Sequence, residues 1–234
     1  MHHFRAPDAR RFVSASLMIG IAFVIFGASF GVLSVSAGAS VAQSCAMSLL
    51  VFTGASQMSA VSVLASGGTV ASAFGGAVLL SGRNAVYGLA MSPVLKEGNL
   101  ASRLLGAQWV IDETTAVVSA ETDPATRRTA FWISGAILYA SWNIGTLLGA
   151  LVGSSINPSD FGLDAAFPVM FTAMIAPHLR TSAGRKAALF GAIAAVTLAP
   201  FMPIGLPILV SALGMLFGLS PATSKPTTLT DGAR

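Results

Sequence analysis

The sequence has little charge. Only 9% of its 234 residues are Asp, Glu, Lys or Arg, whereas 54% are hydrophobic. A soluble domain with so few charges would lack the polar surface that keeps it dispersed. No charged residue occurs in three long stretches, 12–82, 129–159 and 187–224. These stretches exclude an ordinary soluble domain and predict a protein built for a lipid bilayer.

Cysteine, histidine and catalytic motifs are also scarce. Cys45 is the only cysteine, so no internal disulfide is expected, and His2, His3 and His178 are too scattered for a metal site. Because no HExxH, Walker or GxSxG pattern occurs, we expect no enzyme activity, no metal and no cofactor. The net charge of +4 comes from basic residues at the edges of apolar runs, where they orient membrane proteins, so we expect no nucleic-acid binding.

The apolar runs predict an all-α, polytopic transmembrane helical bundle. A span needs roughly 20 apolar residues, which gives about seven spans, some of them discontinuous or re-entrant. The expected spans are 14–36, 43–65, 69–94, 130–152, 164–176, 187–200 and 204–219. They form a single transport domain over 12–220, between a cytoplasmic N-terminal tail at 1–11 and a flexible C-terminal tail at 221–234. Glycines before two apolar segments echo one another, and an internal repeat is therefore a further expectation.

The segment 96–128 mixes charged and apolar residues, so it is either an amphipathic connecting helix or a polar span. Basic residues favour the cytoplasmic edge, which places the N-terminus and the Arg127-Arg128 pair inside. Three ordinary spans before Lys96 would put that residue outside. Either 100–120 crosses part of the membrane or an earlier segment is re-entrant, and in both cases Asp112 and Glu113 lie near membrane depth, where acids are usually functional.

The middle of the expected span 43–65 is polar and contains the run Gly54, Ala55, Ser56 and Gln57. A glycine weakens a helix, and a broken helix frees backbone amides and carbonyls that can bind the two charged groups of a zwitterion. The alternative is that serine and threonine bond to their own helix while glycine permits close packing. The residues alone leave both readings open.

Arg83 is the only charge between Arg11 and Lys96. It either pairs with Asp112 or Glu113, or it extends along its aliphatic stem to the membrane interface.

Three further features of the sequence are informative. Gly145, Gly149 and Gly153 recur every four residues and favour close helix packing. Asn143 and Trp142, on the same helix, are expected to line a cavity; the alternative for Asn143 is a bond to a neighbouring helix. Asp164 is first of all an N-cap, because an Asp before a helix usually caps it.

The run MSLLVFTGASQMSAV over 47–61 resembles the signature of the AzlC family, the azaleucine-resistance proteins. Further similarities follow in order at Arg83 with Tyr87-Gly88, at Asp112-Glu113-Thr114 and at GLDAAFP over 162–168. The resemblance implies the large subunit of an inner-membrane branched-chain amino acid exporter that acts with a small AzlD-type membrane subunit. It implies valine, leucine and isoleucine as substrates, and a heterodimer able to form homo-oligomers.

Residue roles follow from this resemblance and from the polar positions. Expected substrate-binding residues are Gly54, Ala55, Ser56, Gln57, Asn84 and Asn143. Expected coupling or gating residues are Arg83, Asp112, Glu113 and Asp164. The family commonly has Asn two residues before the arginine and His directly after it, whereas this chain has Ser81 and Asn84. A proton-relay role for that histidine would therefore not transfer. The main rival hypothesis is a channel-like or structural membrane subunit for another solute. The least favoured is an intramembrane enzyme, for which the sequence offers no catalytic pair.

Overall fold

The computed structural model of the chain describes residues 6–96, 98–155, 172, 175–176, 178–202, 206–211, 213–214 and 216. Within these residues every regular element is helical, which confirms the predicted all-α class. The helices are, in chain order, α1 (Ala6–Ser36), α2 (Val41–Leu50), α3 (Ala55–Ala65), α4 (Val70–Leu95), α5 (Leu100–Gln108), α6 (Asp112–Ser119), α7 (Pro124–Gly153), the short η3 (His178–Arg180), α9 (Ser182–Leu198) and α10 (Leu206–Ser211).

Polar side chains start the helices at the ends of the bundle. Ser40 forms a capping box with Gln43 at the start of α2, and Thr69, Asn99 and Asp123 cap α4, α5 and α7. Each oxygen accepts a hydrogen bond from a first-turn amide that the helix itself cannot satisfy. These caps fix where the chain reverses direction.

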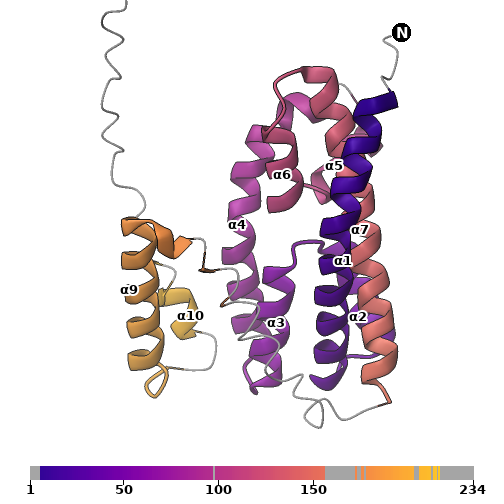
Figure 1. Cartoon of the computed structure of the whole chain (residues 1–234). Coiled ribbons are helices and arrows are strands. Elements are labelled where there is room, and N and C mark those ends of the chain that lie inside the picture. The colour runs from indigo at the N-terminus through magenta and orange to yellow at the C-terminus, as the bar shows by residue number, and fades with distance from the viewer. Residues whose placement is uncertain are drawn as a thin grey trace, which may run out of the picture.

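The helices α2 and α3 form a hairpin, which we call hairpin 1. Helix α2 begins beside the end of α1, where the hydroxyl of Ser44 donates a hydrogen bond of 2.8 Å to that of Ser34. It ends beside the middle of α7, where the hydroxyl of Tyr139 donates a hydrogen bond of 2.9 Å to the carbonyl of Leu49. From this halfway point α3 returns beside α4 to the level at which α2 began (Figure 1). A single span over 43–65 is therefore wrong, because the helix breaks at 51–54 and reverses.

The helices α5 and α6 form hairpin 2, which enters the bundle from the opposite end (Figure 1). Its outer end lies at the start of α1, where Arg11 pairs with Glu121 at 2.8 Å. Its tip lies halfway along the bundle, where Gln108 donates a hydrogen bond of 3.1 Å to the carbonyl of Leu49. The structure combines both sequence alternatives within the bundle: the earlier segment 41–65 forms a hairpin, and 100–120 enters the bundle as well. Their depth in the membrane stays a prediction.

Small residues bring α1 and α7 into backbone contact. A β-carbon added at Gly149 or Gly145 would lie only 2.6 or 2.9 Å from the carbonyl carbon of Ala28 or Val24. Gly27 and Gly31 make equally close approaches to α7 from the other side. The packing interpretation of the glycine spacing is confirmed, and this pair of helices is the rigid frame of the bundle.

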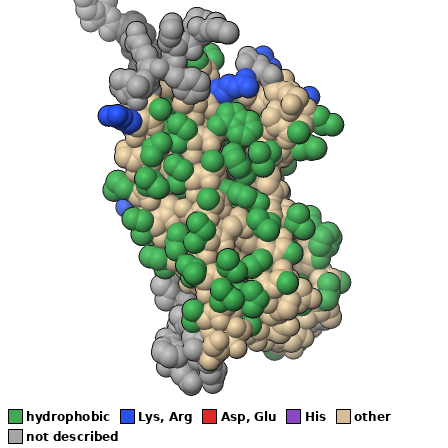
Figure 2. All heavy atoms as spheres, turned by 90° about the vertical axis from the view of Figure 1, so that its right-hand side faces the viewer, with side chains coloured by type: hydrophobic (Ala, Val, Ile, Leu, Met, Phe, Trp, Pro, Cys, Tyr) green, Lys and Arg blue, Asp and Glu red, His purple; other side chains and the backbone are tan. Residues whose placement is uncertain are grey.

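The outside of the bundle is apolar and its inside contains polar groups. Met18, Val70 and Leu89 are 75%, 75% and 76% exposed, whereas Gln57 and Thr114 are fully buried. Figure 2 shows hydrophobic side chains over the whole height of one face, with most of the visible Lys and Arg near its upper end. This distribution suits a protein surrounded by lipid.

Among the described helices, α1 (over Ala9–Ser36) and α7 are long and apolar enough to cross a membrane. Helix α4 has 26 residues, with Arg83 and Asn84 near its middle. Because α1 begins at Ala6, part of the segment expected as an N-terminal tail is helical.

The later part of the chain is described in pieces. Helix α9 covers most of the expected span 187–200, and α10 packs against both α9 and α4. The expected span 164–176, with Asp164, lies mostly outside the described residues, as do parts of 204–219 and the whole tail at 221–234. The repeat expected between the two halves stays a prediction.

Candidate functional site

A cavity of about 220 Å³ lies where the tips of the two hairpins meet. Its walls come from the middle of α1, the middle of α4, the middle of α7 and both tips. The lining residues are Ile19, Ala22, Phe23, Phe26, Phe52, Thr53, Gly54, Ala55, Arg83, Ile111, Asp112, Glu113 and Trp142. Pockets for drug-sized ligands are usually roughly 300–1,000 Å³, so this cavity suits a smaller molecule.

Gln57 holds the break in hairpin 1 together. Its Oε1 accepts from the backbone N–H groups of Gly54 and Thr53 at 3.2 and 3.4 Å, and its Nε2 donates to the carbonyl of Met47 at 3.1 Å. Gly54 has a φ of +60°, which favours glycine. The sharp turn at Gly54 starts α3 inside the bundle, and the side-chain amide of Gln57 pairs with the backbone groups just before α3, whereas the first-turn amides of α3 receive no side-chain cap from Gly54.

Thr114 does the same for hairpin 2. Its hydroxyl accepts from the N–H of Ile111 at 3.1 Å and donates to the carbonyl of Trp109 at 2.7 Å. Gln57 and Thr114 both lie three residues after the N-cap of their helix, Gly54 and Ile111, and both are fully buried. The two tips therefore use one local solution, a polar side chain that closes the break.

We expect Thr114→Val to lower the thermal unfolding midpoint of the purified protein, whereas Thr114→Ser leaves it close to the parent value. The valine keeps the shape but leaves the Ile111 amide and the Trp109 carbonyl unpaired, at a cost of about 1–3 kcal/mol. Gln57→Ala should act in the same direction. Thermal unfolding followed by tryptophan fluorescence measures all three, and equal midpoints for valine and serine would contradict the role of the hydroxyl.

The charged part of the cavity is an ion pair between α4 and hairpin 2. Arg83 Nη1 lies 2.6 Å from Asp112 Oδ2, and both side chains are about one third exposed, at 34% and 32%. The sequence expectation that Arg83 pairs with one of these acids is confirmed for Asp112. Glu113 lies on the same cavity wall and forms no ion pair with a described residue.

The remaining wall is aromatic. Trp142 meets Phe23 edge to face at 5.9 Å and stacks on Phe30 at 6.0 Å, and Phe52 meets Tyr139 edge to face at 5.1 Å. Such pairs are rigid and present an apolar surface of fixed shape.

Two buried polar atoms of cavity-lining residues have no hydrogen-bond partner among the described residues: Asp112 Oδ1 and Trp142 Nε1. Unpaired buried groups are rare and costly, so each needs an explanation. A polar ligand bound in the cavity would supply hydrogen-bond partners for both atoms.

The structure separates the expected site residues into groups. Gly54, Ala55, Arg83, Asp112 and Glu113 line the cavity together. Ser56 and Gln57 lie behind it, where the hydroxyls of Ser56 and Thr53 are bonded to each other.

Asn143 and Asn84 lie elsewhere. Asn143 accepts from Ser48 at 2.8 Å and donates to the carbonyl of Tyr139 at 2.8 Å, so it links α2 to α7 and matches the second reading of this residue. Asn84 lines a second cavity on the other side of α4. Asp164 lies outside the described residues.

Sequence reasoning missed the roles of Thr114 and Phe23. Thr114 directly follows Asp112 and Glu113, in a segment that the sequence had already marked as unusual for its acids. The position of this hydroxyl beside the two acids was the only sign of its role, and its burial became visible in the structure. Trp142 lines the cavity as expected, whereas Phe23 lies in an ordinary apolar run, where no local pattern distinguishes a cavity wall from a core.

Comparison with known proteins identifies relatives. The family model described as "AzlC protein" matches residues 18–156. The chain is 29% identical over 206 residues to inner membrane protein YgaZ of Escherichia coli K12, covering 82% of this chain and 84% of that protein. It is 25% identical over 226 residues to an uncharacterized membrane protein of Helicobacter pylori, covering 93% and 97%. No solved structure matches.

Proposed function

Because the chain belongs to the AzlC family, and is therefore a membrane protein with a transport-related role, we propose that it exports branched-chain or other small hydrophobic amino acids by secondary transport. We also propose a small AzlD-type membrane subunit as its partner in the inner membrane. The observation that carries the proposal is the cavity at the hairpin tips, which joins charges of both signs to an aromatic wall halfway along the bundle.

The cavity offers a place for each part of such a zwitterion. Helix α3 starts at the cavity with no side chain capping its first turn, so its free amides and Arg83 attract a carboxylate. The unpaired Oδ1 of Asp112 and the carboxylate of Glu113 attract an ammonium group. Phe23, Phe52 and the remaining aromatic wall then accept an aliphatic side chain.

Two hairpins that enter from opposite ends give the site two exits. Hairpin 1 separates the cavity from one end of the bundle and hairpin 2 from the other, an arrangement suited to alternating access. In this proposal, each hairpin moves in turn while the α1–α7 frame stays fixed.

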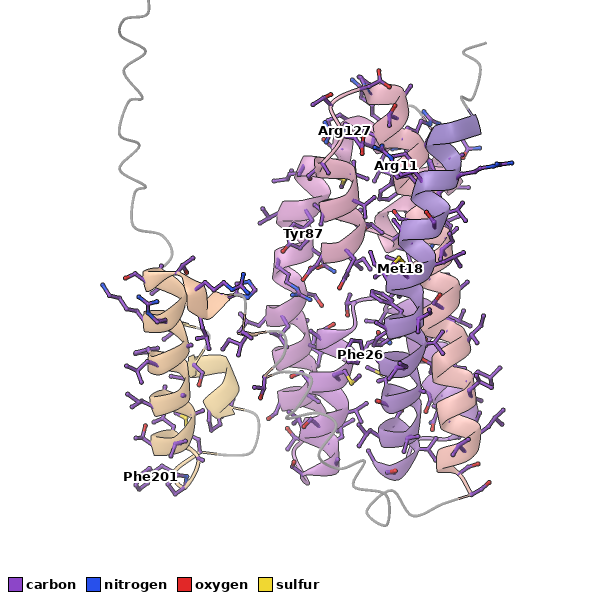
Figure 3. The ribbon with its side chains drawn as sticks, in the orientation of Figure 1. Arg11, Met18, Phe26, Tyr87, Arg127 and Phe201 are labelled. Carbon is purple, nitrogen blue, oxygen red and sulfur yellow. The ribbon has the colours of Figure 1, made fainter. Side chains whose placement is uncertain are left out.

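We further propose that the end with the N-terminus faces the cytoplasm. The described basic residues of α1 to α7, apart from the cavity residue Arg83, lie toward this end, as Arg11 and Arg127 illustrate (Figure 3). The turns at the other end, 37–40, 66–69 and 154–155, contain no charged residue. Positive charge favours the cytoplasmic side.

Export of preloaded labelled amino acids from cells tests the function. We expect valine, leucine and isoleucine to leave faster when this chain is expressed with its neighbouring small membrane protein, whereas lysine and glutamate efflux stays unchanged. The three aliphatic substrates should differ modestly, because a methylene changes binding by only about 1–3 kcal/mol.

Leu89→Ala is the matched control, because Leu89 faces outward and is 76% exposed. It should export like the parent. Efflux that is unchanged for every amino acid, with and without the small protein, would contradict the proposal and favour a structural subunit or another solute.

A further inference from the structure

A second cavity, of about 470 Å³, forms a groove between α4 and α5. Lys96 and Arg103 line its outer end, at the basic end of the bundle. Apolar residues such as Leu100 and Leu104 form its sides, and Asn84 and Val110 line its inner end. The groove therefore runs from the basic end of the bundle toward its middle.

The inner end of this groove lies next to the central cavity. On α4, Arg83 lines the central cavity and the adjacent Asn84 lines the groove. On the hairpin 2 tip, Ile111 lines the central cavity and the adjacent Val110 lines the groove. The two cavities are thus separated by the contact of one tip with one helix, and the Arg83–Asp112 pair ties that contact together at 2.6 Å.

We infer that the groove is the vestibule through which the carboxylate-bearing substrate reaches the central cavity from the basic end. Movement of the hairpin 2 tip away from α4, with opening of the Arg83–Asp112 pair, joins the two cavities into one path. This inference rests on the proposed export function and adds its route, its gate and the residues that attract the substrate.

The charges of the groove fit this ligand. Lys96 and Arg103 form no ion pair with a described residue, and no described acidic residue lines the groove. A wall with one sign of charge raises the local concentration of the opposite charge. At the inner end, the buried Oδ1 of Asn84 has no described partner and can accept from an ammonium group. A path for lipid tails alone would have no use for this amide.

Two glycines of α4 allow a controlled test. A β-carbon at Gly88, which lines the groove, meets no atom within 4 Å. A β-carbon at Gly82 also meets nothing within 4 Å, but Gly82 lines neither cavity. Both positions accept a larger residue without a clash, and only one of them blocks the groove.

The experiment uses the full chain with its small membrane protein and with Cys45→Ala, which removes the single native cysteine. Gly88→Cys and Gly82→Cys are each exposed from the basic side to a membrane-impermeant anionic sulfonate thiol reagent and to a cationic one. We expect modification of Gly88→Cys to reduce leucine export by at least about tenfold, as filling a solute path should. Modification of Gly82→Cys should leave export unchanged.

Adding Lys96→Gln and Arg103→Gln to Gly88→Cys should slow the anionic reagent by roughly tenfold without slowing the cationic one. Arg10→Gln, an exposed basic residue outside the groove, should change neither rate. Excess leucine should slow modification of Gly88→Cys.

Full export after complete modification of Gly88→Cys would overturn the vestibule while leaving the export function intact. Reagent rates that ignore both leucine and the two basic residues would also overturn it and would assign the groove to lipid. A chain that exports no amino acid even before modification would instead overturn the proposed function.

Discussion

Arg83→Ala and Asp112→Asn are each expected to reduce amino acid export by about a hundredfold while the chain still inserts in the membrane. In the proposed site these two side chains contact opposite ends of the substrate and also join α4 to hairpin 2. Losing one member of a charged contact costs about 3 kcal/mol, which corresponds to roughly a hundredfold. Efflux of labelled leucine at matched expression measures the loss.

The double variant Arg83→Ala with Asp112→Asn separates transport from simple pairing. If the pair only stabilised the bundle, removing both charges would leave no uncompensated ion, and export would recover toward the parent level. We expect no recovery, because the site needs the charges themselves. Recovery of export in the double variant would contradict the proposed site, and parent-like thermal unfolding would show that folding is not the cause of the loss.

The break at Gly54 could be predicted from sequence, because glycine and several polar residues interrupt an apolar run. The reversal of direction there could not be predicted. A straight helix with a kink and a hairpin have the same local composition, and the choice depends on packing against α7, which is far away in sequence. For 96–128 the position of basic residues supplied a long-range constraint, which left two alternatives: either 100–120 enters the bundle or an earlier segment turns back within it.

The site could be predicted only where a charged side chain in an apolar stretch needs a partner of opposite charge. An arginine alone in an apolar stretch predicts a nearby acid, and Asp112 meets Arg83 in the structure. Gln57 was equally conspicuous, yet its amide bonds the broken backbone behind the cavity. A sequence shows that a buried amide needs partners without showing whether those partners are a ligand or the chain itself.

Gly149→Leu should prevent stable folding of the bundle. A β-carbon at this position lies 2.6 Å from the α carbon and from the carbonyl carbon of Ala28. Backbone atoms cannot rotate away as a side chain can, so α1 and α7 must separate along their shared face. We expect a loss of at least about 3 kcal/mol, seen as poor yield of monodisperse protein and a lower unfolding midpoint.

Gly82→Leu is the matched control, since its β-carbon meets no atom within 4 Å, and it should fold and export like the parent. Gly149→Ala, which adds only the β-carbon, should lie between the two. A Gly149→Leu protein as stable as the control would contradict the contact between α1 and α7. It would also remove the fixed frame on which movement of the hairpins depends, because a tip can open the cavity to one side only if the helices around it keep their positions.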